Sequence, residues 1–287
     1  MVRERGAGAV DGSRAARRGQ SGALALAFAV ALAAAACAGA PPAPPGAAPR
    51  VVLLGELHDN ADGHARRLAW LAERVDAGWR PVIAMEQFDR DRQADLDRAL
   101  AECAAAACVI RRAGSAGQAW EWKLYAPVIE LAIERKLRLR AANLSRADAS
   151  KVVRGGFRAA LDDATIAAFG LEAPLPADLA DGQRRAIDES HCGTLPTAIA
   201  DGMVRAQVAR DVWMAKVVAE EAARGNGVAL LAGNGHVRRD LGVPRWLAGT
   251  AAAGAVAIGF VEEPAEGVFD VRVAVAPHER EDPCAKK

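Results

Sequence analysis

The sequence predicts an α/β fold with a mainly parallel central sheet flanked by helices. Two observations predict it: short, continuous apolar runs alternate with longer stretches of helical period, and several of these runs end in polar residues. Continuous apolar runs are typical of parallel strands that are buried on both faces. With 287 residues, 52% of them hydrophobic, the chain is long enough to bury such a sheet.

The first unit of the predicted fold is a strand, a helix and a second strand. Apolar runs cover residues 51–54 and 81–85, and the stretch 61–77 between them has the period of an amphipathic helix. Its predicted apolar face carries Leu68, Leu71 and Val75, and its predicted polar face carries Arg66, Arg67, Glu73 and Arg74. A helical crossover of this kind makes the two strands parallel.

The pattern then repeats along the chain. A helix is expected over 120–136 and a strand over 137–142, followed by a helical insertion over 147–190 that covers the sheet. A long helix over 195–224, closed by Gly225, leads to a strand over 228–232. The runs 255–260 and 268–275 are expected to form an antiparallel strand pair at one edge.

The N-terminal residues 1–36 have the pattern of a secretory signal peptide. Basic residues precede a 14-residue apolar run that ends at Ala36, which is too short to span a bilayer as a helix. Cys37 follows three alanines, as in the lipid-attachment site of bacterial lipoproteins, so lipidation of Cys37 is expected, with a plain secreted form as the alternative. Ala38 then favours an outer-membrane location facing the periplasm. Residues 37–50 are expected to be a Pro/Ala-rich tether, 51–278 the folded domain and 279–287 a tail.

Composition limits the classes of partner and indicates the redox state of the cysteines. The chain has 37 basic and 36 acidic side chains and 5% aromatic residues, which favours no nucleic-acid partner. Besides Cys37 there are Cys103, Cys108, Cys192 and Cys284, an even number that favours disulfides in an oxidising compartment. These four cysteines can form two disulfides in three different ways. Cys103 with Cys108, across a short alanine loop, is favoured, and metal ligation by the thiols is the alternative.

Polar residues follow the predicted strands at their carboxyl ends, where parallel sheets bind ligands. Glu56, His58 and Asp59 follow the first strand, and Glu86, Asn143 and His236 follow three others. Glu56, Glu86, His58 and His236 can hold a divalent metal ion, or they can act as acid and base without one. His64, Asp59 and Asn143 are expected to support them. The structural alternative is that these side chains form ion pairs at the domain surface or begin helices.

Tyr125 is the only tyrosine, and Trp120 and Trp122 lie close to it in the sequence. A buried aromatic cluster is one interpretation, and a phenolate ligand to haem iron is the other. The chain contains no P-loop, dinucleotide-binding, zinc-protease or G-x-S-x-G motif, which disfavours serine hydrolase chemistry.

Several of these segments together resemble the ChaN family of haem-binding lipoproteins over residues 51–260. The similar segments are 51–59 with His64, 84–86, 122–127, 142–143, 233–236 and 242–244. The resemblance implies an α/β fold, a surface-anchored role in haem and iron uptake, and haem held by a tyrosine at the interface of a homodimer. Tyr125, His58 and His236 are the residues expected to bind haem.

The wider Tiki superfamily, to which ChaN proteins are assigned, includes metal-dependent peptidases and an esterase-like branch. Gly55-x-x-His58 and Gly233-x-x-His236 are similar to its paired motifs, and Glu56 and Glu86 match its acidic positions. This second resemblance implies an alternative function, a divalent-metal-dependent hydrolase in which Glu56 and Glu86 are catalytic. A noncatalytic envelope scaffold is a third interpretation.

Overall fold

The computed structural model describes residues 50–115, 120–282 and 284–285. The predicted signal peptide, Cys37 and all of the tether except Arg50 lie outside these residues. No helix in the described part of the chain is long and apolar enough to cross a membrane.

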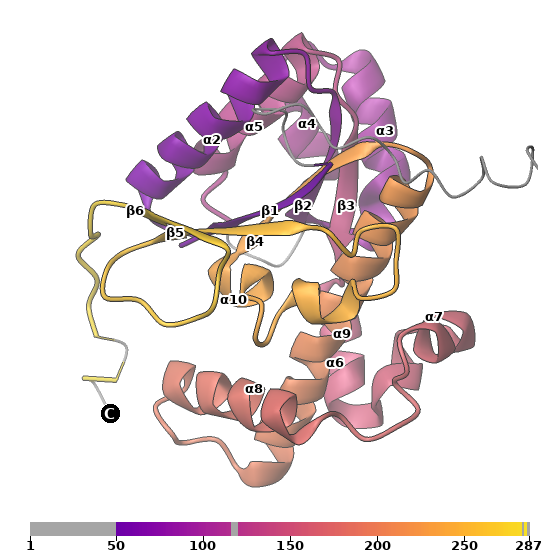
Figure 1. Ribbon diagram of the computed structural model, residues 1–287, viewed down its shortest axis with the longest axis vertical. Helices are drawn as coiled ribbons and strands as arrows, with labels where there is room; N and C mark the ends of the chain where they lie inside the picture. The colour runs from indigo at the N-terminus through magenta and orange to yellow at the C-terminus, as the bar shows by residue number, and fades with distance from the viewer. Residues whose placement is uncertain (1–49, 116–119, 283, 286–287) are drawn as a thin grey trace, which may run out of the picture. The chain divides into compact units, whose positions relative to one another are not determined.

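The described residues form a six-stranded sheet in the order β3-β2-β4-β1-β5-β6, and every neighbouring pair of strands is parallel (Figure 1). The strands are β1 (Val51–Glu56), β2 (Pro81–Asp89), β3 (Leu139–Asn143), β4 (Gly227–Gly233), β5 (Val256–Val261) and β6 (Val271–Ala274). All residues of β1 and β2 are buried, as expected for continuous apolar runs between two layers of helices. The predicted α/β fold is confirmed.

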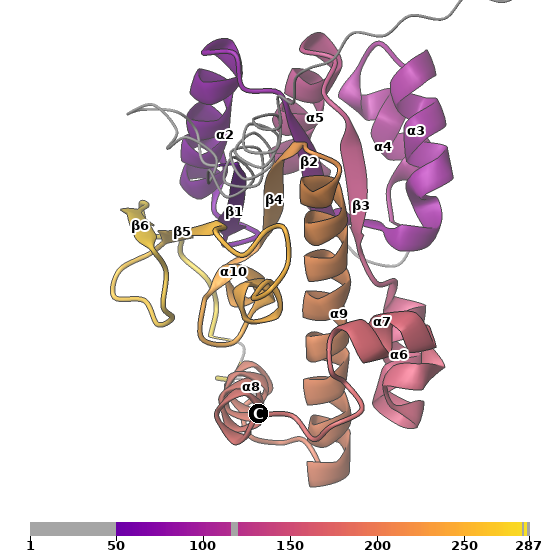
Figure 2. The same cartoon turned by 45° about the vertical axis from the view of Figure 1, so that its right-hand side comes forward.

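Helices pack on both faces of the sheet, and each layer has its own apolar core (Figures 1 and 2). One face is covered by α2 (Ala61–Asp76), α3 (Gln93–Glu102), α4 (Ala106–Ala113) and α5 (Trp122–Glu134). The other face is covered by the second half of α9 (Thr197–Ala223) and by the short helix η4 (Val243–Trp246). Two further short helices are η2 (Arg90–Arg92) and α10 (Asn234–Val237).

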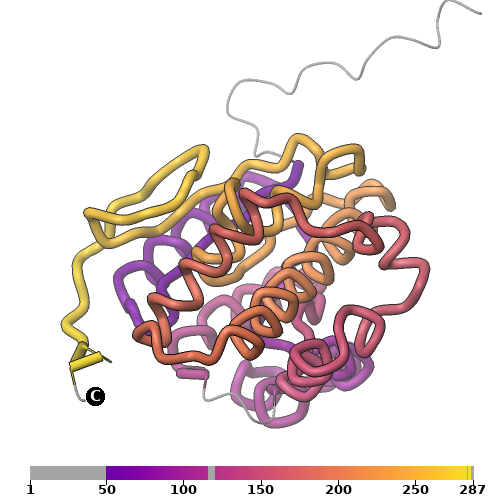
Figure 3. Tube along the Cα trace, turned by 90° about the horizontal axis from the view of Figure 1, so that it is seen from below, coloured from indigo at the N-terminus to yellow at the C-terminus, as the bar shows by residue number. Residues whose placement is uncertain are grey.

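The predicted insertion is helical, but it does not lie over the sheet. It contains α6 (Arg146–Gly155), η3 (Phe157–Ala159), α7 (Asp163–Ala168) and α8 (Ala177–Ser190). Its apolar side chains, such as Val152 and Leu179, form a separate core with Val208 and Val212 of α9. Figure 3 views the molecule from this end, with α8 and the start of α9 nearest the viewer. The insertion therefore extends the molecule beyond the carboxyl ends of the strands.

The prediction of an antiparallel pair at the sheet edge was wrong, because β6 runs parallel to β5. The connecting loop turns back past the start of β5 before β6 begins. Arg239 donates its backbone N–H to the carbonyl of Val268, and Asp270 donates its own to Ala257 at the start of β5. Phe269 packs against Gly259, where a side chain on the glycine would collide with its ring.

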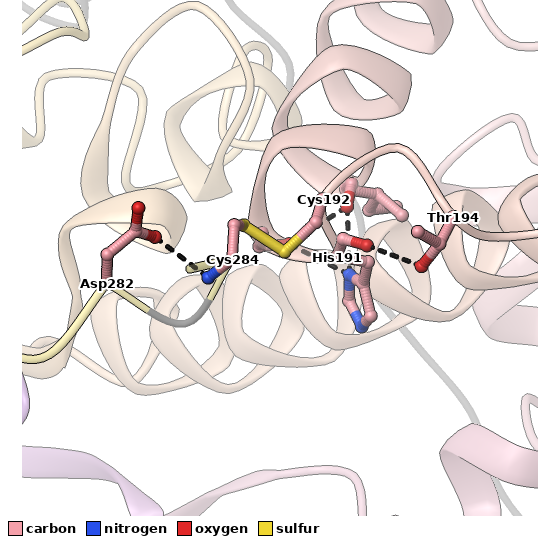
Figure 4. The surroundings of a disulfide bond; sticks show 7 residues. His191, Cys192, Thr194, Asp282 and Cys284 are labelled. Atoms are coloured by element: carbon pink, nitrogen blue, oxygen red, sulfur yellow. Dashed lines mark hydrogen bonds between the residues drawn. A yellow bond between two sulfur atoms is a disulfide. The ribbon is translucent and has the colours of Figure 1, made fainter. Parts of the chain in front are cut away.

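Both disulfides expected from the favoured pairing are present. Cys103 and Cys108 join the end of α3 to the start of α4. Cys192 and Cys284 join the residues after α8 to the C-terminal tail (Figure 4). The second bridge closes a long loop, with a sequence separation of 92 residues.

Candidate functional site

The carboxyl ends of the central strands open into a cleft of about 400 Å³. The structure brings Glu56, His58, Glu86 and His236 together in its wall, from β1, β2 and α10. The complete lining is Glu56, Leu57, His58, Glu86, Gln207, Arg210, Gly233, Asn234, Gly235 and His236. The expected convergence of strand-end residues on one rim is therefore present.

Glu56 is the centre of a buried polar network. Its carboxylate forms an ion pair with Arg67 of α2, and both side chains are almost completely inaccessible to solvent. Tyr125 donates its hydroxyl to Oε1 of Glu56 over 2.6 Å, and Nε2 of Gln87 lies 3.4 Å from the same oxygen. A buried carboxylate is stable only when it is paired and hydrogen-bonded in this way.

His58 is the exposed end of this network. Its Nδ1 lies 2.9 Å from Oε1 of Glu56, and the side chain is about half exposed. A carboxylate that is paired with arginine only accepts hydrogen bonds, so Nδ1 is the donor, and in the neutral ring Nε2 is the nitrogen that carries the lone pair. A Cβ on Gly233 would lie 3.0 Å from Nε2, so a side chain at this position would push the His58 ring aside.

His64 supports the loop that carries His58. Its Nδ1 accepts a hydrogen bond from Arg67 over 3.1 Å, so its Nε2 donates to the carbonyl oxygen of His58 over 3.2 Å. Burial lowers the pKa of His64, which agrees with a neutral ring. His64 therefore fixes the backbone beside His58, as expected for a supporting residue.

His236 lies between two carboxylates. Its Nδ1 is 2.5 Å from Oδ1 of Asp211, and its Nε2 is 3.5 Å from Oε1 of Glu86. Burial alone would lower the pKa of His236, but the charges of Glu86 and Asp211 outweigh it and raise that pKa to about 10. Burial raises the pKa of Asp211 to about 6. Near neutral pH the ring is therefore a cation held by two anions.

Glu86 connects the two histidines. Burial opposes ionisation of this side chain, but His236, His58 and the backbone N–H of Gly233 hold its pKa well below the usual range. The N–H of Gly233 donates to Oε2 over 2.8 Å. Glu86 is therefore an ionised acceptor at the base of the cleft.

Asn143 and Asp59, which were both predicted to support the site, lie in two separate places. Asn143 ends β3, is fully buried and accepts a hydrogen bond from Arg210 of α9 over 3.0 Å. Asp59 instead points to the C-terminal tail, where it accepts two hydrogen bonds of 2.6 Å from Arg280. Arg280 also binds Glu262, so this tail is fastened next to the loop that carries His58.

Tyr125 does not fit the predicted role of an iron ligand. Its side chain is fully buried, its hydroxyl is donated to Glu56, and the rings of His64, Trp120 and Trp122 surround it with centroids 4.8 to 6.1 Å away. Burial raises the pKa of Tyr125, which disfavours the phenolate form that binds ferric iron. The alternative interpretation, a buried aromatic cluster, agrees with the structure.

The predicted metal ligands are near one another, but they do not form a coordination sphere. Among the described ranges, no group of three or more His, Cys, Asp or Glu side chains is arranged to hold a metal ion. The Glu56 carboxylate is already used by Arg67, Tyr125 and His58. Metal binding by His58, His236, Glu56 and Glu86 stays a prediction.

Three functional side chains were not predicted from the sequence. Arg67, placed on the polar face of its helix, is 2% exposed and faces the sheet. Arg67 precedes Leu71 by four residues, and residues four apart lie on the same face of a helix, so this spacing could have revealed its buried position. Asp211 and Arg210 both lie on α9, and a polar pair within an otherwise apolar helical segment was the available signal.

Comparisons with known proteins identify similar sequences and a similar fold. A family model described as "Haem-binding uptake, Tiki superfamily, ChaN" matches residues 46–247. The structure reporting cofacial haem binding to ChaN of Campylobacter jejuni is 20% identical and has a TM-score of 0.62, covering 79% of this chain and 88% of that chain. A mutant erythromycin esterase in its open conformation is 17% identical with a TM-score of 0.42, covering 74% of this chain and 69% of the esterase. No curated protein matches the sequence. The Campylobacter likeness shows a shared fold.

Proposed function

The chain belongs to the ChaN family of the Tiki superfamily, and we propose that it binds haem for uptake with His58, and not Tyr125, as the iron ligand. The observation that carries this proposal is the pairing of His58 with Glu56. His58 is half exposed at the cleft, and its protonated Nδ1 faces the buried carboxylate. Nε2 is the nitrogen left to bind iron.

The surrounding residues suit a histidine ligand. A carboxylate that accepts the Nδ1 proton fixes the tautomer and orientation of a metal-binding imidazole and makes it more basic. Arg67 and Tyr125 hold that carboxylate in place, and Trp120 packs edge-on against the His58 ring, with centroids 5.0 Å apart. Haem, when bound, supplies the iron that is the cargo of uptake. In this proposal Tyr125 is a positioning residue.

Haemin titration of the purified protein tests the proposal. We expect a saturable Soret band at one haem per chain, lost in His58→Ala. His278→Ala is the matched control, because His278 is an exposed histidine that does not line the cleft. Non-saturating absorbance, or equal binding by wild type and His58→Ala, would overturn the assignment.

The signal-peptide pattern of residues 1–36 supports a place for the protein in the cell envelope. We propose that Cys37 is lipidated and anchors the domain to the outer membrane, facing the periplasm, and that haem binding is linked to a homodimer. Metabolic labelling with a radioactive fatty acid, compared with Cys37→Ser, tests the anchor. Size-exclusion chromatography with and without haemin tests the dimer, and an unchanged elution volume would count against it.

A second function is favoured by the second histidine. His236, charged between Asp211 and Glu86, faces the same cleft as Nε2 of His58. In hydrolysis of an ester or amide, Nε2 of His58 would take a proton from water as the resulting hydroxide attacks the carbonyl carbon. His236 would stabilise the oxyanion and then donate its proton to the leaving group.

Chromogenic esters and amides test this second function. We expect turnover lost in both His58→Ala and His236→Ala, and kept in His278→Ala. A rate that is abolished by a chelator and restored by zinc would instead support the divalent-metal hydrolase. No turnover of any substrate, together with saturable haem binding, would leave uptake as the function and contradict hydrolysis.

A further inference from the structure

Arg210 is a cleft residue that neither proposed function uses. It lies on α9 and lines the cleft beside His236 and Glu86. Its Nη1 donates to Oδ1 of Asn143 over 3.0 Å, and Asn143 is fully buried at the end of β3. This hydrogen bond holds the guanidinium in one place before a ligand arrives.

Arg210 makes no ion pair with any residue in the described part of the chain, where a pair requires a nitrogen and a carboxylate oxygen within 4.0 Å. Burial raises the pKa of Asp89 and of Asp211, and the charge of Arg210 lowers it in both. Asp211 is hydrogen-bonded to His236, and the buried carboxylate of Asp89 lies outside ion-pair distance of Arg210. Arg210 therefore keeps guanidinium donors available to the cleft.

The other charged groups at the cleft are paired with one another. Glu56 is balanced by Arg67, and the anions Glu86 and Asp211 share the cation His236. Arg210 is the third cation near the three anions Glu56, Glu86 and Asp211, and it is the one that is in ion-pair contact with none of them. A planar guanidinium with free N–H groups binds a carboxylate through two parallel hydrogen bonds.

We propose that Arg210 recognises a carboxylate group of the ligand that occupies this cleft. This inference rests on the proposed haem function, since haem carries two propionate carboxylates. It assigns the cleft a ligand class: an anionic molecule whose carboxylate lies against α9 while its reacting or metal-bearing part lies near His58.

The test compares haemin with its dimethyl ester, which has the same ring and iron without the two negative charges. We expect wild type to bind haemin about tenfold more tightly than the ester, equal to about 1.4 kcal/mol. In Arg210→Met the two should bind equally, through weaker binding of haemin. Arg210→Lys should recover part of the preference, because it keeps the charge and loses the two-pronged geometry.

Arg205→Met is the matched control. Arg205 lies on the same helix but lines a different cavity, so the preference for haemin should be kept. An equal affinity of wild type for haemin and ester, or a preference that survives in Arg210→Met, would overturn the proposal.

A second measurement separates this proposal from the haem function. Without haem, succinate at millimolar concentration should raise the melting temperature of wild type, and succinamide at equal ionic strength should not. The succinate shift should be absent in Arg210→Met. If haemin fails to bind while this shift holds, the haem function is wrong and the carboxylate site stands. If succinate gives no shift, or the same shift in Arg210→Met, the carboxylate site is wrong.

Discussion

Tyr125 donates its hydroxyl to Oε1 of Glu56 across 2.6 Å, and neither side chain is exposed to solvent. The same oxygen lies 2.9 Å from Nδ1 of His58. The tyrosine therefore acts one step away from the cleft, through the carboxylate that orients the exposed histidine. This contact distinguishes the structure of this chain from the family expectation of a tyrosine iron ligand.

Tyr125→Phe should therefore destabilise the fold without removing a ligand. The variant leaves a buried charged acceptor with one donor fewer, which costs about 1–3 kcal/mol. Urea unfolding followed by circular dichroism measures this loss. Trp122→Phe serves as a packing control, because it shortens a neighbouring ring without touching Glu56. A Tyr125→Phe protein as stable as wild type would contradict the assigned role.

Arg67→Met should be the more damaging of two adjacent arginine substitutions. It leaves the buried Glu56 carboxylate without its cation, which costs about 3–5 kcal/mol. Arg66→Met removes only an exposed pair with Asp62, worth less than about 1 kcal/mol. Chemical denaturation of both variants checks the contrast. Similar losses for the two would show that Arg67 is not the buried partner of Glu56.

Stability should fall in alkaline solution because of His236. Its pKa is about 10 in the folded protein and near 6.5 when unfolded. The raised pKa contributes stability that is fully present below pH 6.5 and is lost as the pH rises through about 10. The effect is on the order of a few kcal/mol. Denaturation at a series of pH values should show this slope in wild type and a flatter profile in His236→Gln, whereas His278→Gln should behave like wild type.

Asp211 should affect stability over a separate and more acidic pH range. Burial raises its pKa from 3.8 to about 6, so the native state binds a proton more tightly than the unfolded chain does. This effect lowers stability as the pH rises from about 4 to about 6. Asp211→Asn should remove that slope in the same denaturation series. A slope that persists in the variant would assign it to another carboxyl group.

The two disulfides should differ in their contribution to stability. The Cys192–Cys284 bridge spans 92 residues and the Cys103–Cys108 bridge spans 5. Loop-closure entropy predicts losses of about 4–5 and about 2 kcal/mol for Cys284→Ser and Cys108→Ser. Thermal unfolding measures both. Because Arg280 holds the same tail against Asp59, Arg280→Ala in the Cys284→Ser background should release the tail and increase its cleavage by protease.

Much of the fold was predictable because it follows from local patterns. The strands β1, β2 and β4 are continuous apolar runs, and the polar residues at their ends converge because parallel strands end at the same edge. The favoured disulfide pairing was also correct. The strands and the short Cys103–Cys108 loop are local in sequence, and the convergence of the strand ends follows from a rule that holds for all parallel sheets.

The remaining features depend on contacts between distant segments. The direction of β6 is set by a loop that meets Arg239 and Gly259, and no local pattern encodes that path. The side of α2 on which Arg67 lies is set by the buried Glu56, so an arginine beside another arginine gave a misleading polar face. Asp211 reaches His236 because α9 packs against β4, the strand that leads into α10.

The most direct test of the central claim is a haemin titration of His58→Ala and Tyr125→Phe side by side, with wild type as reference. The account predicts that His58→Ala abolishes the saturable Soret band, whereas Tyr125→Phe keeps the band and its position. Loss of the band in Tyr125→Phe, with binding retained in His58→Ala, would contradict the account and return the iron to the tyrosine.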